Sequence, residues 1–380
     1  MLKAYKTEIK ISKEQEEKLK RSIGTCRFIY NLYIATNIEN YKKGGKFISA
    51  YDFSKWLNNS YLKENKDKLW IKETSSKAIK QSIINAETSY KRFFTKQSKF
   101  PKFHLKHNDK TKFYFVKTDS KTIIKVERYR IKIPTIGWVI LKEKGYIPHY
   151  KSNYLVKSGT ISYEHNRWYV SCLVDIPESP KTKLNNNGIG IDLGIKNFIT
   201  ISNGKVFDNI NKTKKIKKLE SLLKTRQKSL SKKFTKGDIS KKYLKQKSKV
   251  NATYRKLTNI RTDYVNQCVS EIVKTKPSYI TIEDLNIKGM LKNRCLSKSI
   301  KDLKLYEFRM KLQNKCREYG VELRIANRFY PSSKMCSECG TIYKDLKLSD
   351  RVYKCECGNI IDRDLNASIN LMKCNDYKVA

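Results

Sequence analysis

The spacing of apolar residues predicts helices in the first part of the chain and strands in the part that follows. In residues 13–40 and 74–97, apolar side chains recur at helical spacing, which is typical of helices with one buried face. Between residues 111 and 175 the apolar residues form short alternating runs, and the last two runs flank a predicted hairpin turn at residues 164–166. These runs predict a small antiparallel β domain in the form of a barrel.

A polar segment rich in structure-breaking residues, at positions 176–188, predicts a domain boundary. Beyond it, apolar strands alternate with helical segments, which predicts an α/β domain. The expected strands lie within residues 188–207, where two strands are joined by a tight turn, and within 279–284 and 321–326; the expected helices lie within 211–260, 261–275 and 300–319. The glycine-rich phosphate loop that is typical of nucleotide hydrolases does not occur.

The charge of the chain predicts a nucleic-acid partner. Lys and Arg number 82 and Asp and Glu number 36, a formal net charge of +46 at pH 7, and so large an excess would repel itself unless a polyanion neutralised it. Residues 211–260 alone contain 18 Lys and Arg and 2 acids, which predicts one or two solvated helices facing a phosphate backbone. Two alternatives stay open: a lysine-rich composition that reflects an AT-rich genome, and a charged helix that has no partner.

The sequence also bears on location, because it contains no segment suited to a membrane. No apolar run approaches the roughly 20 residues that span a bilayer, and no apolar segment follows the basic N-terminus. We therefore expect a soluble, intracellular protein without a membrane partner.

Four of the ten cysteines are crowded near the C-terminus: Cys336, Cys339, Cys355 and Cys357. Fifteen residues separate the two pairs, which is the spacing of a zinc ribbon, and a glycine after each pair permits a tight turn. The second pair, Cys-Glu-Cys, is one residue shorter than the usual knuckle, which predicts strain in tetrahedral coordination. Two disulfides and four unrelated thiols are the alternative interpretations. The other six cysteines are scattered, as in proteins of reducing compartments.

Three carboxylates, Asp192, Glu283 and Asp364, end predicted strands or begin a predicted helix. Asp192 points away from the apolar face of its strand, and Gly190 and Gly194 beside it are expected to leave room for a metal ion and a phosphate. Carboxylate oxygens are the ligands that a pair of Mg²⁺ ions needs in order to hydrolyse a phosphodiester. All four histidines lie upstream of this region, which argues against histidine-based nuclease chemistry.

Three segments resemble the TnpB family of transposon-encoded proteins, which are relatives of type V CRISPR effector nucleases. GIGIDLGIKNFITIS, YITIEDLNIKGM and RFYPSSKMCSECG…CECGNIIDRDLNAS look like the three RuvC motifs and the zinc element of that family. The resemblance extends over nearly the whole chain. It implies an α/β and β multi-domain protein with an RNase H-like (RuvC) nuclease core, an inserted zinc ribbon, and an oligonucleotide-binding β barrel, the wedge, that carries an inserted helical recognition domain. The implied domains are residues 1–12 and 108–185 for the wedge, 13–107 for the recognition domain, 186–330 and 359–380 for the RuvC domain, and 331–358 for the zinc ribbon that binds target nucleic acid.

The same resemblance implies an RNA-guided DNA endonuclease of a transposable element. Such a protein would bind a guide noncoding RNA from the transposon end and cleave double-stranded DNA beside a transposon-adjacent motif, as a monomeric ribonucleoprotein in a prokaryotic cytoplasm or nucleoid. Asp192, Glu283 and Asp364 would hold two Mg²⁺ ions, and the four clustered cysteines would hold a structural Zn²⁺. Asp364, rather than Asp362, matches the catalytic acid of the family. The alternatives are an RNA-guided DNA-binding repressor without nuclease activity and a strand-joining transposase.

Three further residues are candidates for reading the DNA motif. The helix predicted over residues 74–97 is similar to the helix with which the family reads that motif. Lys77 and Gln81 lie one turn apart on it, and Tyr51 is a third candidate. The alternative interpretation is that Lys77 and Gln81 are solvent-facing polar residues of an amphipathic helix.

Overall fold

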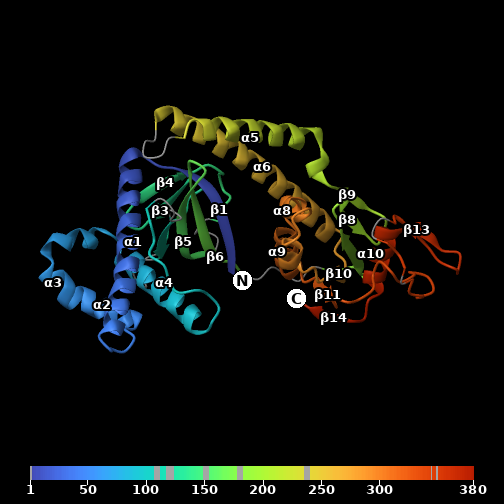
Figure 1. The fold of residues 1–380 in the computed structure, drawn as a ribbon, viewed down its shortest axis with the longest axis horizontal. Coiled ribbons are helices and arrows are strands. Elements are labelled where there is room, and N and C mark those ends of the chain that lie inside the picture. Colours follow the sequence, from blue (N-terminus) through green and yellow to red (C-terminus); the bar gives the residue numbers. More distant parts are fainter. Residues whose placement is uncertain are drawn as a thin grey trace. The chain divides into compact units, whose positions relative to one another are not determined.

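The chain forms two compact units, Met1–Glu178 and Ser179–Ala380, which divide within the polar segment 176–188. The computed structural model (Figure 1) describes residues 2–106, 112–116, 124–148, 154–177, 183–234, 240–343, 345–347 and 350–380. Within these ranges no helix is long and apolar enough to cross a membrane.

The N-terminal unit contains a six-stranded antiparallel sheet in the order β2-β5-β6-β1-β4-β3. Its strands are β1 (Leu2–Lys10), β2 (Lys112–Val116), β3 (Arg130–Ile133), β4 (Gly137–Leu141), β5 (Leu155–Glu164) and β6 (Arg167–Asp175). β1 lies inside the sheet, where it pairs with β6 and β4. The N-terminal strand therefore completes a sheet whose other strands come much later in the chain. The predicted antiparallel sheet is present, and its closure into a barrel stays a prediction.

The β5-β6 hairpin turns more tightly than the sequence predicts. His165 and Asn166 both have positive φ, 49° and 64°, which is the conformation of a two-residue type I′ turn. Glu164, which was expected in the turn, ends β5 and pairs with Arg167.

Four helices lie, along the sequence, between β1 and β2. They are α1 (Lys13–Lys42), α2 (Ala50–Trp56), α3 (Leu62–Glu64) and α4 (Ser76–Phe94), with a π-helical turn at Leu57–Tyr61 and a 3₁₀ helix at Lys66–Glu73. Ser12 begins α1 with a capping box, in which the Ser12 hydroxyl and the Gln15 side chain each accept a backbone hydrogen bond from the other residue. The first half of α1 packs on the sheet through Leu19 and Ile23, whereas its second half packs against α2 and α4. Both predicted helices of this unit are confirmed.

The C-terminal unit contains a mixed six-stranded sheet in the order β14-β11-β10-β7-β8-β9. Its strands are β7 (Ile189–Leu193), β8 (Asn197–Ile201), β9 (Val206–Asp208), β10 (Tyr279–Glu283), β11 (Glu322–Ala326) and β14 (Tyr377–Val379). β7, β10 and β11 run parallel at the centre, and β8, β9 and β14 run antiparallel to their neighbours. The predicted strands of this unit are confirmed.

Helices cover this sheet, and the apolar core of the unit lies between the two. The long helices are α5 (Lys214–Lys232), α6 (Lys241–Lys274), α9 (Leu305–Tyr319) and α10 (Arg363–Lys373), and the short ones are α7 (Ile287–Met290) and α8 (Ser297–Leu303). The second half of α6, together with α8 and α9, supplies the core with buried residues such as Val269, Ile300 and Phe308. α10 packs on β7, β8 and β10.

Two predictions about these helices are wrong in detail. The helix expected over 261–275 is the second half of α6, which continues unbroken for 34 residues. The helix expected over 300–319 is interrupted at Lys304, whose φ of 57° is left-handed and separates α8 from α9. In the basic stretch, α5 has one buried residue, Ile216. The solvated helices expected there are therefore present.

Candidate active site and metal centre

Two of the three candidate acids end neighbouring parallel strands. β7 and β10 pair with Ile191 opposite Ile282, and Asp192 and Glu283 are the next residues along the two strands. Because parallel neighbours lie about 4.8 Å apart and side chains alternate in phase, Asp192 and Glu283 lie on the same face of the sheet. The Ser332 hydroxyl donates a hydrogen bond of 2.6 Å to Glu283 Oε1 and so fixes the orientation of that carboxylate.

The third acid lies in the first turn of α10. Asp362 is the N-cap of this helix, and its Oδ1 accepts hydrogen bonds from the N–H groups of Asp364 at 3.0 Å and Leu365 at 3.1 Å. The side chain of Asp364 is nearly buried and forms an ion pair of 3.4 Å with Arg363. Asp362 therefore fixes the helix end that carries Asp364.

The three carboxylates interact electrostatically. Burial raises the pKa of Asp192 well above its ordinary value, and the charges of Glu283 and Asp364 raise it further. The pKa of Glu283 is raised as well, by burial and by Asp364, although the Ser332 hydroxyl opposes the change. Bound divalent cations would relieve this repulsion, so the donor set fits hard metal ions.

Among the described residues, the four cysteines are the one group of potential metal ligands whose donor atoms all lie within 4.8 Å of one another.

Gly190 and Gly194 do not leave room for a metal ion and a phosphate, so the interpretation drawn from the sequence is wrong. A Cβ on Gly190 would lie 2.0 Å from the carbonyl oxygen of Ser368 and 2.4 Å from the backbone nitrogen of Met372. A Cβ on Gly194 would lie 2.9 Å from the carbonyl oxygen of Asn197. Gly190 is required because α10 packs directly on the backbone of β7, and this contact brings Asp364 to the sheet.

We expect Gly190→Ala to lower the free energy of unfolding by about 3 kcal/mol or more, because the methyl group would overlap the backbone of α10. Urea denaturation measures this change. Gly24→Ala is the matched control, because the added methyl group meets a single atom within 4 Å, Arg27 Nη2 at 3.9 Å, and alanine is favoured in a helix by about 1 kcal/mol. Equal stability of the wild-type chain and the Gly190→Ala variant would contradict the packing described here.

The four clustered cysteines meet as predicted. All ten cysteines are free, which excludes the disulfide interpretation. The Sγ atoms of Cys336 and Cys357 are 3.7 Å apart, and those of Cys339 and Cys355 are 3.5 Å apart. Tetrahedral zinc with Zn–S bonds of about 2.3 Å requires S–S separations of about 3.8 Å. The shorter second knuckle therefore does not prevent four sulfur atoms from fitting one zinc ion.

Glycine turns and hydrogen bonds shape the cysteine cluster. Gly340 and Gly358 have positive φ, 77° and 89°, as their predicted role in the knuckles requires. Burial raises the pKa of the Cys336 thiol, but hydrogen bonds from the Asn359 side chain and from nearby backbone N–H groups outweigh it and lower the pKa to about 6. The N–H of Asn359 favours the thiolate of Cys357, but the neighbouring thiols raise its pKa to about 12. A divalent cation is needed before all four can be thiolates.

Two buried asparagines of α10 connect the cysteine cluster to the acids. The Asn366 side chain donates to Met335 O at 2.7 Å and accepts from Ser337 N at 2.9 Å. The Asn370 side chain donates to Ser332 O at 2.8 Å and to Met335 O at 2.6 Å. The loop held in this way contains Cys336 and also Ser332, the hydroxyl partner of Glu283. Sequence reasoning missed these roles, and the only signal was the position of the asparagines one turn apart in the helix that follows the cysteines.

We expect Asn370→Ala to lower the free energy of unfolding by about 2 kcal/mol, because the buried Ser332 carbonyl would lose a donor and the Met335 carbonyl would keep only the donor from Asn366. Thermal or urea unfolding measures the loss. Asn266→Ala, on an exposed position of α6, is the control and should change stability by no more than about 0.5 kcal/mol. If both variants unfold alike, the asparagines of α10 do not hold the loop.

An arginine pair also flanks the acids. Asp284, directly after Glu283, accepts hydrogen bonds from Arg309 at 3.1 Å and from Arg328 at 2.6 Å. Burial would raise the pKa of Asp284, but the two guanidinium groups hold it below its ordinary value. Asp284 is therefore a charged anchor for the loop after β11 rather than a fourth metal ligand.

The candidate motif readers belong to the N-terminal unit, whereas the acids and the cysteine cluster belong to the C-terminal unit. Lys77 is exposed in the first turn of α4, and Gln81 lies one turn further and donates to Asn85 Oδ1 at 2.9 Å. Tyr51, in α2, is 77% exposed. The Ala50 N–H, beside Tyr51, donates to Glu87 of α4. The three residues are thus accessible and are carried by helices that contact each other.

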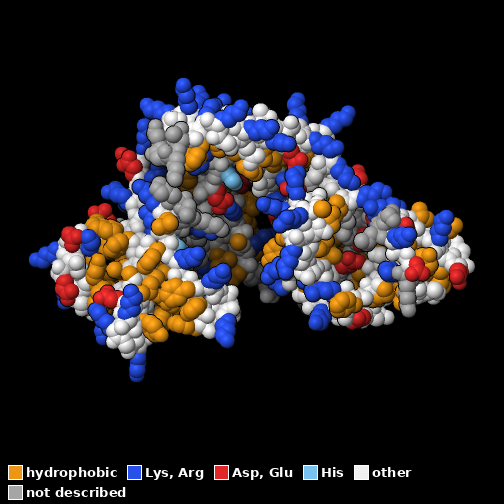
Figure 2. Space-filling view, in the orientation of Figure 1, with side chains coloured by type: hydrophobic (Ala, Val, Ile, Leu, Met, Phe, Trp, Pro, Cys, Tyr) orange, Lys and Arg blue, Asp and Glu red, His pale blue; other side chains and the backbone are white. Residues whose placement is uncertain are grey.

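Basic residues cover the helical hairpin of α5 and α6. In Figure 2, Lys and Arg side chains project from the outer surface of these helices. Arg261 connects the hairpin internally, through ion pairs to Glu220 of α5 at 2.8 Å and to Asp302 of α8 at 2.9 Å. The lysines of α5 are all exposed, which is the arrangement of a phosphate-binding surface.

Three family models match the chain: OrfB_IS605, described as "Probable transposase", over residues 171–294; "Cas12f1-like, TNB domain" over 306–371; and "Helix-turn-helix domain" over 1–46. The chain is 29% identical to "Putative RNA-guided DNA endonuclease InsQ" of Escherichia coli (strain K12), with 98% of this chain and 92% of that relative aligned. It is 28% identical to "Putative RNA-guided DNA endonuclease" of Streptomyces pristinaespiralis, with 97% of this chain and 88% of that relative aligned. The chain is therefore similar to proteins of the TnpB family over nearly its whole length. The predicted resemblance is confirmed.

The fold of the chain resembles those of two solved CRISPR-associated proteins. One chain of a Cas12f1–sgRNA–target DNA complex matches with a TM-score of 0.63 at 14% identity, covering 100% of this chain and 99% of that chain. A Cas_phi3 endonuclease matches with a TM-score of 0.50 at 11% identity. Among the described residues 2–46, the chain forms β1 and the single helix α1, rather than two short helices joined by a turn.

Proposed function

We propose that this protein is an RNA-guided DNA endonuclease that cleaves double-stranded DNA in one RuvC-type site. The observation that carries the proposal is the register of β7 and β10, which brings Asp192 beside Glu283 on the face that α10 supplies with Asp364. The names of the relatives support the same activity. They do not favour a repressor without nuclease activity or a strand-joining transposase.

Asp192, Glu283 and Asp364 would hold two Mg²⁺ ions. Bound there, the ions would activate a water and stabilise the leaving oxygen of the phosphodiester. The protein's own contribution is positional: Ser332 orients Glu283, Asp362 fixes the start of α10, and Arg363 pairs with Asp364. Cys336, Cys339, Cys355 and Cys357 would hold a structural Zn²⁺, which keeps the loop with Ser332 in place.

Each domain has a role in the proposal. Residues 1–12 and 108–185 act as the wedge, 13–107 as the recognition domain, 186–330 and 359–380 as the nuclease domain, and 331–358 as the zinc element. Lys77, Gln81 and Tyr51 read the adjacent DNA motif. The basic surface of α5 and α6 follows the backbone of the guide–target duplex, and base pairing supplies the sequence specificity. The particle is a monomeric ribonucleoprotein of a prokaryotic cytoplasm.

Incubation of the protein and its copurified RNA with a target plasmid and Mg²⁺ tests the proposal. We expect double-strand breaks beside the adjacent motif, and no breaks when EDTA replaces Mg²⁺. Binding without breaks would favour the repressor, and joined strands would favour the transposase. A preparation that contains no bound RNA would contradict the proposal.

A further inference from the structure

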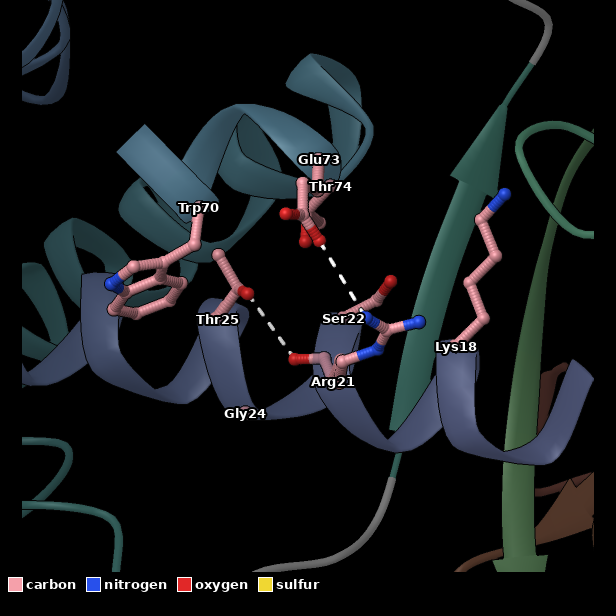
Figure 3. Close-up of a pocket in the computed structure, with 8 residues that line it drawn as sticks. All are labelled: Lys18, Arg21, Ser22, Gly24, Thr25, Trp70, Glu73 and Thr74. Atoms are coloured by element: carbon pink, nitrogen blue, oxygen red, sulfur yellow. Dashed lines mark hydrogen bonds and ion pairs between the residues drawn. The ribbon is translucent and has the colours of Figure 1, made fainter. Parts of the chain in front are cut away.

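A cavity of about 360 Å³ lies beside α1 in the N-terminal unit (Figure 3). Its walls are formed by one side of α1 and by the end of the 3₁₀ helix with the turn that follows it. The lining residues are Lys18, Arg21, Ser22, Gly24, Thr25, Trp70, Glu73 and Thr74. The proposed nuclease mechanism uses none of them.

One wall of the cavity contains Gly24, which has no side chain. Gly24 lies inside α1, where glycine costs about 1 kcal/mol relative to alanine. A Cβ built there would meet only the end of the Arg27 side chain, at 3.9 Å, and the φ of Gly24 is not positive. Neither packing nor backbone conformation within the described residues requires glycine at this position. A ligand that occupies the space over Gly24 would account for the presence of glycine at this position.

The interior of the cavity offers hydrogen-bonding groups. The side chains of Ser22 and Thr74 are 4% and 5% exposed and line the cavity, so their hydroxyl groups are the polar groups of its inner wall. α4 begins at Ser76, two residues after Thr74, and its N-cap Ser75 makes no side-chain capping bond. The cavity lining ends at Thr74 and includes no residue of α4 itself.

Cationic and aromatic side chains complete the lining. Figure 3 shows Trp70 at one end of the cavity, Lys18 at the other and Arg21 between them. Arg21 is 3.9 Å from Glu73, and both side chains are more than 65% exposed, so this ion pair is weak and leaves Arg21 available. Trp70 is 40% exposed and packs edge-on against Phe28, with ring centroids 5.4 Å apart. Phe28 thus fixes one part of the indole while the rest stays accessible.

We propose that this cavity binds one nucleotide of the nucleic acid that the N-terminal unit holds. The base would stack on Trp70, and the phosphate would face Lys18 and Arg21. Glu73 could accept a hydrogen bond from an amino group of the base. The identity of the ligand as nucleic acid rests on the proposed function, and the same chemistry serves a nucleotide of the guide RNA or of the DNA.

Gly24→Leu tests the inference, because leucine fills the cavity while little within the protein opposes its side chain. Two affinities are measured. The first is that of the full-length chain for the RNA that copurifies with the wild-type protein, and the second is that of the ribonucleoprotein for a DNA duplex with the adjacent motif. We expect one of the two affinities to fall by at least about 10-fold, with no fall in the melting temperature. Ala35→Leu, on an exposed position of the same helix, is the matched control and should change neither.

Trp70 provides a second variant pair. Trp70→Ala should weaken the same affinity as Gly24→Leu, and Trp70→Phe should retain most of it, since a phenyl ring still stacks on a base. A fall in RNA affinity assigns the site to the guide, and a fall in DNA affinity alone assigns it to the DNA. If Gly24→Leu is folded and both affinities equal those of Ala35→Leu, the inference is wrong. The readout of this test is binding to RNA and DNA. A wild-type protein that binds both but does not cleave would therefore contradict the proposed function and leave the test of the nucleotide site unaffected.

Discussion

Replacement of Asp192 by asparagine is expected to lower the rate of guided DNA cleavage by at least about 10³-fold and to leave RNA binding unchanged. Asparagine keeps the shape of the side chain but removes the negative charge that would hold the metal ions. Asp192 is nearly buried near the end of β7, and it is not one of the residues of the basic surface of α5 and α6. The rate of plasmid cleavage at saturating Mg²⁺ and the RNA affinity measure the two effects separately.

The same variant should be more stable than the wild-type chain when EDTA removes metal ions. Burial, Glu283 and Asp364 raise the pKa of Asp192 in the folded chain. Folding is therefore favoured by protonation of Asp192, and this contribution is lost as the pH rises through the raised pKa. At pH 8 asparagine avoids that loss, so the melting temperature of the variant should exceed that of the wild-type chain. The difference between the two melting temperatures should shrink as the pH falls toward about 3.9, the pKa of aspartate in an unfolded chain.

Asp263→Asn is the control for both effects, because Asp263 is an exposed acid of α6 in the same unit. It should leave the cleavage rate and the melting temperature nearly unchanged. If Asp192→Asn cleaves at the rate of this control, the assignment of the catalytic acids is wrong.

Loss of the sulfur cluster is expected to have the second largest effect. Purified protein should contain about one zinc ion per chain, and Cys336→Ser should lose the zinc together with at least about 100-fold in cleavage rate. Cys336 lies in the loop that Asn366 and Asn370 hold against α10, and the same loop carries Ser332, the partner of Glu283. Loss of zinc should therefore displace residues of the active site, and added Mg²⁺ should not restore cleavage.

Elemental analysis and the plasmid assay measure these outcomes. Cys295→Ser, at an exposed cysteine outside the cluster, is the control and should keep both zinc and activity. A zinc-free preparation with full activity would show that the cluster does not support the site.

The strands that carry the acids were predictable because their signal is local. Alternating apolar residues around Asp192 and Glu283 reveal both strands, and helical spacing reveals α1 and α4. The cysteine pairs reveal their own cluster, since metal ligands occur at characteristic spacings. The limits of α6 and the break at Lys304 depend on packing and on one left-handed residue, which apolar spacing does not encode.

The connections between the elements were not predictable. Gly190 flanks an acid in the sequence, which favoured a metal-binding interpretation, whereas its role is to admit the backbone of α10. Ser332, Asn366 and Asn370 act through contacts made between segments that are distant in sequence. No periodicity or spacing in a single sequence reports such contacts, and the space over Gly24 is likewise defined only by the folded chain.

A change of guide tests the central claim most directly. The RNA that copurifies with the protein would be sequenced, its guide segment replaced by one complementary to a second plasmid, and both plasmids offered to the reconstituted ribonucleoprotein with Mg²⁺. We predict that double-strand breaks move to the second plasmid, beside the same adjacent motif, and disappear from the first. Cleavage that ignores the new guide, or that proceeds equally well without RNA, would contradict the assignment of this protein as an RNA-guided DNA endonuclease.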